Sequence, residues 1–450
     1  MIDGIIEDND KSSLHFSEEE DETKEFPKVK FERVSKKYFT ISFTQCMQYN
    51  NQIVNTIYPN YPPVFYMNNL NPQHPNIKNT NNYNRKEKRF KTTTFLNNGV
   101  NMQVELLLYG INQDLIKNDK IDYFIYNRLK GNFVNVMKTH KGSKIFQTYL
   151  MKTPPDIIHA IYLEIKFNIS DIMCDFYGNY FCKKFFGVLN KKDRVDFILT
   201  IKNNFNKLAF DNVGTFPIQG IIEQVNTVYE KKLIVSLIKN GLSLFCFNAS
   251  GAHVIEKIIS CFEIEYTKFI VEYAISSFMS LSMDQSGICV IKKIIEINNE
   301  RSLYYNSLKK NVIESIHILI NHQFGNQVIQ TVITSWSDIS EIFLLIRNNM
   351  CALSNGKYSS NVINKCIERS DEILSEYIKE LNKNDMIGEV MKNSFGNYVI
   401  QKALKIAKGI NERELAESVN RNIYKLNDKK LILKWKNIVM SHIINESDIV

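Results

Sequence analysis

Residues 396–401 read GNYVIQ: a small residue, a variable pair, two apolar residues and a polar one. The same pattern occurs seven more times before it, with successive copies starting 34 to 38 residues apart. The eight copies are GSKIFQ from Gly142, GNYFCK from Gly178, GTFPIQ from Gly214, GAHVIE from Gly251, GICVIK from Gly287, GNQVIQ from Gly325, SSNVIN from Ser359 and GNYVIQ from Gly396. A fixed period of this size is typical of a solenoid, in which each unit buries its apolar face against its neighbours.

The apolar residues of each copy continue at helical spacing. We call the residue after the leading small residue position one. Positions three and four are apolar in every copy, and most residues three and four places further on are apolar too, as in Ile258-Ile259. At about 100° per residue these four sites share one stripe of a helix. The sequence therefore predicts an all-α repeat fold, with one buried and one presented face on each of these helices.

Composition narrows the class of protein further. No run of about 18 apolar residues occurs, so a membrane-spanning helix is not expected. The acidic start MIDGIIEDND lacks the basic flank and apolar stretch of a secretory signal. Eight cysteines form no CxxC pair and eight histidines show no metal-ligand spacing, which favours free thiols and no metal site. We find no catalytic constellation and no phosphate-binding glycine loop, so neither an enzyme nor a cofactor is predicted.

Charge and composition divide the chain. Residues 1–25 carry ten acids against two lysines, whereas the whole chain has a net charge of +8, so the remainder carries +16. Residues 50–101 are rich in asparagine, and six of the nine prolines lie before residue 80. We predict a mostly disordered tail over residues 1–103 and a repeat domain over 104–448. The basic body suggests a polyanionic partner, although a coding bias toward Lys, Asn and Ile would explain it as well.

Positions one, two and five lie together on the helix face opposite the apolar stripe. Position one is Ser143, Asn179, Thr215, Ala252, Ile288, Asn326, Ser360 and Asn397. Position two is Lys144, Tyr180, Phe216, His253, Cys289, Gln327, Asn361 and Tyr398. Position five is Gln147, Lys183, Gln219, Glu256, Lys292, Gln330, Asn364 and Gln401. We expect all three side chains of each triplet to be presented along one continuous surface.

The residue types at these positions suit a nucleic acid. Positions one and five lie one turn apart, so two amide side chains can bind one planar base edge together. Four of the residues at position two are rings, which suit stacking between splayed bases. Position six is lysine in five copies, where it either neutralises phosphates or only keeps the surface solvated. A protein-interaction scaffold also has a polar face, but it has no reason to repeat Asn or Ser with Gln at a fixed phase.

These segments resemble the RNA-binding helices of the Pumilio (PUF) family. GNYVIQK at Gly396, KYSSNVINKCIE at Lys357 and FGNQVIQ at Phe324 are similar to its repeats eight, seven and six. The resemblance implies a right-handed α-solenoid crescent of eight three-helix repeats with half-repeat caps. It further implies a monomer that binds single-stranded RNA on the concave face, one base per repeat, with the last repeat at the 5′ end.

The last three repeats match the family pattern most closely. The resemblance implies that Asn397 and Gln401 read U as the first base, with the tyrosine at position two stacking beside it. Repeat six has the same amide pair and implies U as well, although Gln327 stands where the family has tyrosine. Ser360 matches the G-reading serine of repeat seven. Its partner Asn364 stands where the family usually has Glu, which leaves the choice of G open.

The earlier repeats depart from the pattern. Repeat five has Ile288 and Lys292 where Cys or Ser with Gln would select A. Repeat four has Ala252 and Glu256 instead of Asn and Gln, and the Glu could accept from an amino group of G or C. The triplets of repeats three and one imply A, and repeat two is regular except for Lys183. Together they imply a 5′-U-G-U core, a loosely specified middle and an A near the 3′ end.

The family resemblance implies a cytoplasmic regulator of messenger RNA. Such a protein binds 3′ untranslated regions and recruits deadenylase or translational repressor proteins to its convex face, with no membrane association. Two alternatives stay open. One is a PUF-like ribosome-assembly factor with low sequence specificity, which the irregular triplets favour. The other is a protein-interaction scaffold without RNA binding.

Overall fold

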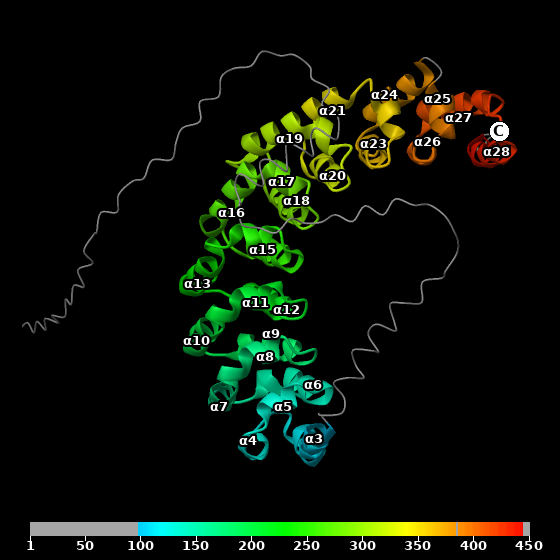
Figure 1. Cartoon of the computed structure of the whole chain (residues 1–450). Helices are drawn as coiled ribbons and strands as arrows, with labels where there is room; N and C mark the ends of the chain where they lie inside the picture. The colour runs from blue at the N-terminus through cyan, green and yellow to red at the C-terminus, as the bar shows by residue number, and fades with distance from the viewer. Residues whose placement is uncertain (1–97, 384–385, 444–450) are drawn as a thin grey trace, which may run out of the picture. The chain divides into compact units, whose positions relative to one another are not determined.

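Figure 1 shows the chain as a computed structural model, which describes residues 98–383 and 386–443. These residues belong to one compact unit. All regular elements among them are helices, as predicted. α3 (Asn98–Asn118) begins within the last residues of the predicted tail, and the rest of that tail lies outside the described residues. Within the described part, none of the helices combines the length and apolar character needed to cross a bilayer.

The helices follow one another in a repeating order of short, inner and outer. The inner helices, which contain the repeat segments, are α6 (His140–Tyr149), α9 (Gly178–Val188), α12 (Thr215–Gln224), α15 (Ala249–Cys261), α18 (Gly287–Ile297), α20 (Gly325–Ser335), α23 (Ser359–Ile367) and α26 (Gly396–Ile406). The outer helices are α7 (Pro155–Ile165), α10 (Lys191–Ile201), α13 (Val228–Lys239), α16 (Ile264–Ser276), α19 (Tyr305–Leu319), α21 (Ser340–Ile346), α24 (Asp371–Asn382) and α27 (Gly409–Ile423).

The remaining helices precede the inner helices or lie at the two ends of the described unit. The short helices are α5 (Phe133–Met137), α8 (Ile169–Met173), α11 (Phe205–Phe210), α14 (Leu242–Cys246), α17 (Phe278–Ser282), α22 (Met350–Ser354) and α25 (Met386–Lys392). Single 3-10 turns follow α6, α7 and α10. At the ends lie α3 and α4 (Tyr123–Leu129) on one side and α28 (Lys429–Ile443) on the other.

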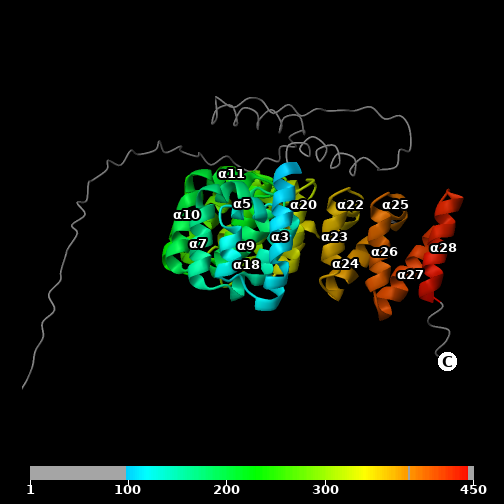
Figure 2. The ribbon, with the colours of Figure 1, turned by 90° about the horizontal axis from the view of Figure 1, so that it is seen from below.

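Each inner helix packs against the next one, from α6 to α26. Within this unit the stack bends, with the inner helices on its concave side and the outer helices on its convex side (Figure 1). Seen from below, α23, α26 and α28 follow one another in a row (Figure 2). The solenoid that the repeat period predicted is therefore confirmed. Its apolar stripe is confirmed too: positions three and four are buried in every inner helix, except for the half-buried Ile145.

One repeat departs from the three-helix order. α19 (Tyr305–Leu319) runs without a break through the stretch that elsewhere forms an outer helix and a separate short helix. The absence of Gly and Pro does not explain this, because residues 264–282 also lack both and still form two helices, α16 and α17. The sequence prediction of three helices in each repeat is therefore wrong at this place.

The leading small residue of each repeat is required by close packing. A Cβ on Gly142 would lie 2.1 Å from the carbonyl oxygen of Val136, so a larger residue would collide with backbone. Repeat seven has Ser359 instead, and its Oγ donates a 2.7 Å hydrogen bond to the carbonyl of Leu353. Leu353 is six residues before Ser359, just as Val136 is six residues before Gly142. In repeat seven, a side-chain hydrogen bond to this carbonyl therefore takes the place of the close approach of the glycine.

A polar side chain three residues before the leading glycine fixes the start of each segment. Its oxygen or nitrogen accepts from the backbone N–H of that glycine in all repeats except the seventh. The acceptors are Thr139, Asp175, Asp211, Asn248, Asp284, His322 and Asn393. Such caps satisfy N–H groups that the first turn of a helix leaves unpaired, so the inner helices begin in a fixed register.

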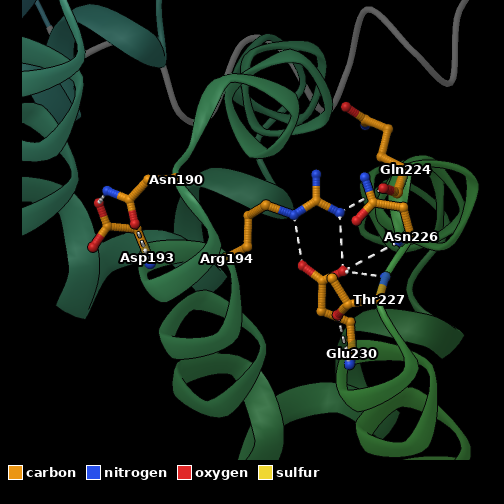
Figure 3. A network of polar contacts seen from close by, with 7 residues as sticks. All are labelled: Asn190, Asp193, Arg194, Gln224, Asn226, Thr227 and Glu230. Carbon is orange, nitrogen blue, oxygen red and sulfur yellow. Dashed lines mark hydrogen bonds and ion pairs between the residues drawn. The ribbon is translucent and has the colours of Figure 1, made fainter. Parts of the chain in front are cut away.

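Ion pairs join neighbouring repeats on the outer side, and the best buried of them is shown in Figure 3. Arg194 on α10 donates through Nε to Glu230 Oε1 on α13 at 2.6 Å, and the two side chains are only 9% and 1% exposed. The Glu230 carboxylate also accepts from the backbone N–H groups of Asn226 and Thr227, which completes a capping box with Thr227. One carboxylate thus holds a cation from one repeat and the start of a helix in the next.

Candidate nucleic-acid interface

The three predicted contact positions differ in exposure. Side chains at position two are exposed in every repeat except the fifth, where Cys289 is half-buried, and the rings of Tyr180, Phe216 and Tyr398 are 58%, 60% and 62% exposed. Position five is half-buried in every repeat except at Lys183, which is exposed. Position one is buried in all eight repeats, with residue exposures of at most 7%. The expectation that all three residues are equally presented is therefore wrong for position one.

In repeats one and three, the residue at position one bonds to the start of the neighbouring inner helix. Ser143 Oγ donates to the backbone carbonyl of Tyr177 at 2.8 Å, and Thr215 Oγ1 donates to that of Ser250 at 3.4 Å. Tyr177 and Ser250 each directly precede the leading glycine of the following repeat. In these repeats position one therefore lies between two inner helices. The periodicity of one repeat does not reveal this, because the residues that bury position one belong to the next repeat.

The three asparagines at position one share one orientation. Asn326 donates through Nδ2 to the backbone carbonyls of His322 and Gln323, at 2.7 and 3.0 Å. Asn179 and Asn397 donate to the equivalent carbonyls of their own repeats. Because both hydrogens of each amide are used on the preceding turn, the oxygen Oδ1 is turned toward position five.

Position five bonds directly to position one in four repeats. In each of them the glutamine donates through Nε2 to an oxygen of the buried residue. The pairs are Gln147–Ser143 at 3.0 Å, Gln219–Thr215 at 3.1 Å, Gln330–Asn326 at 2.8 Å and Gln401–Asn397 at 2.9 Å. The structure thus brings these predicted partners together, with position one as the floor of each site and the glutamine at its rim.

The other four repeats lack this bond. Ala252 and Ile288 are buried apolar residues with no polar atom to offer, so Glu256 instead contacts His253 Nδ1 at 2.6 Å. In repeat seven Asn364 Oδ1 is buried without a hydrogen-bond partner in the described part of the chain. In repeat two the ammonium of Lys183 lies 2.9 Å from a carboxylate of the next repeat. The irregular triplets of the sequence are therefore irregular in geometry as well.

That carboxylate belongs to Glu223, which sequence reasoning missed. It sits between two lysines: Lys183 at 2.9 Å and the position-six Lys257 at 2.5 Å. Glu368 contacts Lys402 and Lys365 at 2.5 and 3.0 Å in the same way. Each of these acids lies nine places after the leading residue of its repeat. This shared position, together with the lysines at position six, is the sequence signal from which the ion pairs could be predicted.

The lysines lower the pKa of both carboxyl groups. The hydrogen bond from Lys257 is the largest cause at Glu223, followed by that from Lys183. At Glu368 the hydrogen bond from Lys402 is the largest cause. Both acids are therefore ionised at neutral pH and hold these ammonium groups within the chain. Lys184 is exposed, and Lys293 lies 3.5 Å from Glu296.

No metal centre accompanies these side chains in residues 98–383 and 386–443, where no group of three or more His, Cys, Asp or Glu residues could hold an ion. Cysteines of that part are free thiols, and burial raises the pKa of Cys246 to about 12. The chemistry that the site offers is therefore that of hydrogen bonding, stacking and charge.

Comparisons with known proteins agree with this architecture. The profile of the PUF family, described as Pumilio-family RNA binding repeat, matches residues 277–302, 315–342, 349–378 and 387–414. Pumilio homolog 12 of Arabidopsis thaliana is 29% identical over 329 residues, which cover 70% of this chain and 55% of that protein. A Pumilio domain-containing protein of Schizosaccharomyces pombe is 28% identical over 292 residues, covering 64% and 43%. The chain thus spans about half the length of these curated relatives.

Solved structures show the same fold. The crystal structure of PUF-8 in complex with PBE-RNA has a TM-score of 0.64 and 23% identity, and covers 75% of this chain and 99% of that one. The Puf3 RNA binding domain bound to the Cox17 RNA 3′ UTR recognition sequence site A has a TM-score of 0.61 and 24% identity, with 72% and 99% covered.

The bent stack of helices and its inner row of paired side chains define an α-solenoid repeat protein. The matched PUF repeats correspond to the fifth to eighth inner helices. The chain thus contains Pumilio-type (PUF) repeats and is similar to Pumilio proteins over most of its length.

Proposed function

We propose that this protein binds single-stranded RNA along the inner helices, with base selection at the pairs of positions one and five. The observation that carries the proposal is the repeated geometry: a half-buried glutamine is held by a buried polar residue, beside an exposed side chain at position two. Four glutamines are held in this way, in repeats one, three, six and eight. Fixed donors and acceptors of this kind suit the edges of unstacked bases.

Repeat six illustrates how such a pair can select a base. The bond to Asn326 fixes the amide of Gln330, which keeps one N–H and the oxygen Oε1 for a ligand. A uracil offers a carbonyl beside an N–H, so it can accept from Nε2 and donate to Oε1. Asn326 then acts by orienting the glutamine. A pair of good hydrogen bonds to a base edge is worth about 1–3 kcal/mol of discrimination.

Side chains at position two supply the stacking surface. The rings of Tyr180, Phe216 and Tyr398 are more than half exposed, although aromatic side chains are usually buried. Stacking of a base on an aromatic side chain contributes about 1–3 kcal/mol and accepts every base. The rings therefore add affinity, while the glutamines between them add selectivity.

The finer proposal follows the family. It is a cytoplasmic protein that binds 3′ untranslated regions with a U-G-U core, the 5′ end at repeat eight, and recruits repressor or deadenylase proteins to its convex side. The similarity to the Puf3 domain, whose structure holds a 3′ UTR recognition sequence, supports the target class. The regular amide pairs of repeats six and eight support the two uracils.

Selection from a randomised RNA pool tests the function. Enrichment of a core with U at the positions of repeats eight and six supports a sequence-specific regulator. Binding without sequence enrichment would instead support a PUF-like assembly factor. The irregular triplets of repeats two, four, five and seven favour this alternative. A chain that retains no RNA would be a protein-interaction scaffold, and the proposal would be wrong.

Changing Asn364 to glutamate should sharpen the choice of G at the second base. The Asn364 oxygen is buried without a partner, and guanine offers two N–H donors that a carboxylate can accept. We expect the preference for G over A to rise about tenfold, measured by competition between RNAs that differ only at this base. The matched variant Gln330→Glu should raise the share of G at the third base instead. An unchanged preference in both variants would contradict the assignment of position five.

Changing Glu223 to glutamine should strengthen RNA binding at low salt without changing sequence preference. The variant releases Lys183 and Lys257 from their ion pairs, so both can contact phosphates. For single strands each added phosphate contact steepens the slope of log K against log salt by about 0.7. Glu263→Gln is the control, because that acid contacts Lys231 on the outer helices. Equal effects of the two variants would show that the position of the lysines does not matter.

A further inference from the structure

The last helix brings a lysine to the eighth repeat. α28 packs against α27 and lies next to α26 in the row of inner helices (Figure 1). Trp435 holds it there: the indole is fully buried, and Nε1 donates to the carbonyl of Met391 at 3.3 Å. Lys434 directly precedes this tryptophan and follows Asn397 by 37 residues, which is one repeat length. Lys434 could not be found from the repeat pattern, because α28 does not carry it.

Lys434 contacts two members of the eighth triplet. Its Nζ donates to Asn397 Oδ1 at 2.8 Å and lies 5.2 Å from the centroid of the Tyr398 ring. The side chain is half-buried, so the ammonium lies at the surface of the site. A hydrogen bond and a cation–π contact together hold it over the floor of the triplet.

Repeat six provides a matched comparison, because it has the same Asn–Gln pair. Among the described residues, Asn326 Oδ1 accepts only from Gln330. Asn397 Oδ1 accepts from both Gln401 and Lys434, which uses both lone pairs of that oxygen. Gln401 Nε2 also donates to the backbone carbonyl of Asn397 at 3.1 Å, so its two hydrogens are engaged as well. The two repeats therefore present different atoms to a base.

We infer that Lys434 is a specificity-determining residue of repeat eight, where its ammonium supplies the donor that selects uracil. The inference rests on the proposed function. The site offers Gln401 Oε1 as an acceptor and the two remaining hydrogens of the ammonium as donors. Uracil is the one RNA base whose ring N–H lies between two carbonyl groups. Its N–H therefore donates to Gln401, and a carbonyl on either side accepts from Lys434.

The other bases fit this arrangement less well. Adenine and cytosine place an amino group beside the ring nitrogen, and its hydrogens face the cation unfavourably. Guanine has a carbonyl on only one side of its ring N–H. A charged donor strengthens the discrimination, since charge-assisted hydrogen bonds are about twice as strong as neutral ones. Repeat eight should therefore choose U more strictly than repeat six does.

The test compares Lys434→Met with Lys436→Met. Both remove one charge from α28, but Lys436 lies over the ring of Tyr424, 5.2 Å from its centroid, away from the triplet. Affinity is measured for four RNAs that differ only in the first base of the U-G-U core. We expect Lys434→Met to weaken the U-first RNA about tenfold and the other three much less. Lys436→Met should leave the preference unchanged, and Lys434→Arg should retain part of it.

Four results would overturn the inference. An equal loss on all four RNAs with a flatter salt dependence would make Lys434 a phosphate contact only. Unchanged or tighter binding would mean that the ammonium merely fills the empty site. A wild-type protein that binds none of the RNAs would remove the proposed function and the inference with it. If wild type selects U at the third base but not at the first, the function stands and the role of Lys434 falls. Thermal unfolding of each variant checks that the fold is intact.

Discussion

Replacing Arg194 with methionine should lower the free energy of unfolding by about 3–5 kcal/mol. The guanidinium bonds a carboxylate that is only 1% exposed, and methionine leaves Glu230 buried without its cation. Removing one partner of a buried pair costs more than the pair contributes, because the remaining charge can neither be solvated nor matched. Chemical denaturation followed by circular dichroism measures the loss.

A double variant separates this effect from lost packing. Arg194→Met combined with Glu230→Gln removes both charges, so it should be less destabilised than Arg194→Met alone. Lys192→Met is the control, since Lys192 is exposed on the same helix and should change stability by less than about 0.5 kcal/mol. A cost below about 1 kcal/mol for Arg194→Met would show that the pair is solvated.

The same pair predicts a pH dependence. Burial raises the pKa of Glu230, but the hydrogen bonds from Arg194 and from the backbone of Thr227 and Asn226 outweigh it, so the pKa lies below its ordinary value of 4.5. Because the folded pKa is lower than the unfolded one, the carboxylate stabilises the fold above pH 4.5. This stability is lost as the pH falls through the folded pKa, and Glu230→Gln should remove that part of the acid sensitivity.

Replacing both Asn397 and Gln401 with alanine should weaken binding of a U-first RNA by roughly 1–3 kcal/mol and relax the choice of the first base. The variant removes the glutamine acceptor and the floor that orients it, while the exposed ring of Tyr398 remains for stacking. Affinities for RNAs with each of the four first bases measure both effects.

Asn326 and Gln330 provide the control for this change. Their double alanine variant should relax the third base and leave the first base unchanged, because the two pairs lie in different repeats. Equal losses on cognate and scrambled RNA from the Asn397/Gln401 variant would contradict base selection by these residues. Thermal unfolding must accompany the measurement, since Asn397 also donates to the backbone of Asn393 and Ser394.

The fold could be predicted because the same apolar pattern recurs in every repeat of the sequence. Apolar residues such as Val399 and Ile400 recur at one phase eight times, and a stripe that is repeated at a fixed period can only be buried by stacking. The same phase predicted that Gln401 lies one turn from Asn397, and the structure places them in contact. Selection of particular bases by these pairs stays a prediction.

The missed features all lie between repeats. Helical periodicity describes one helix, so it did not reveal that the next helix covers Ser143 or that Glu223 holds lysines from the repeats on both sides. Lys434 was missed for the same reason, since its partner Asn397 is in another element. The fusion within α19 was missed because its sequence, like that of residues 264–282, contains no Gly or Pro, and yet the latter stretch forms two helices.

The hydrogen bond from position one to the following repeat limits which substitutions can be used to change the base preference of such a protein. Ser143 and Thr215 each donate across the seam, so the residue that adjusts a glutamine also ties two units together. An asparagine substituted there would donate to the carbonyls of its own preceding turn, as Asn326 does, and the hydrogen bond between the two repeats would be lost. Substitutions at position one that change the base preference would therefore also change the stiffness of the helical stack.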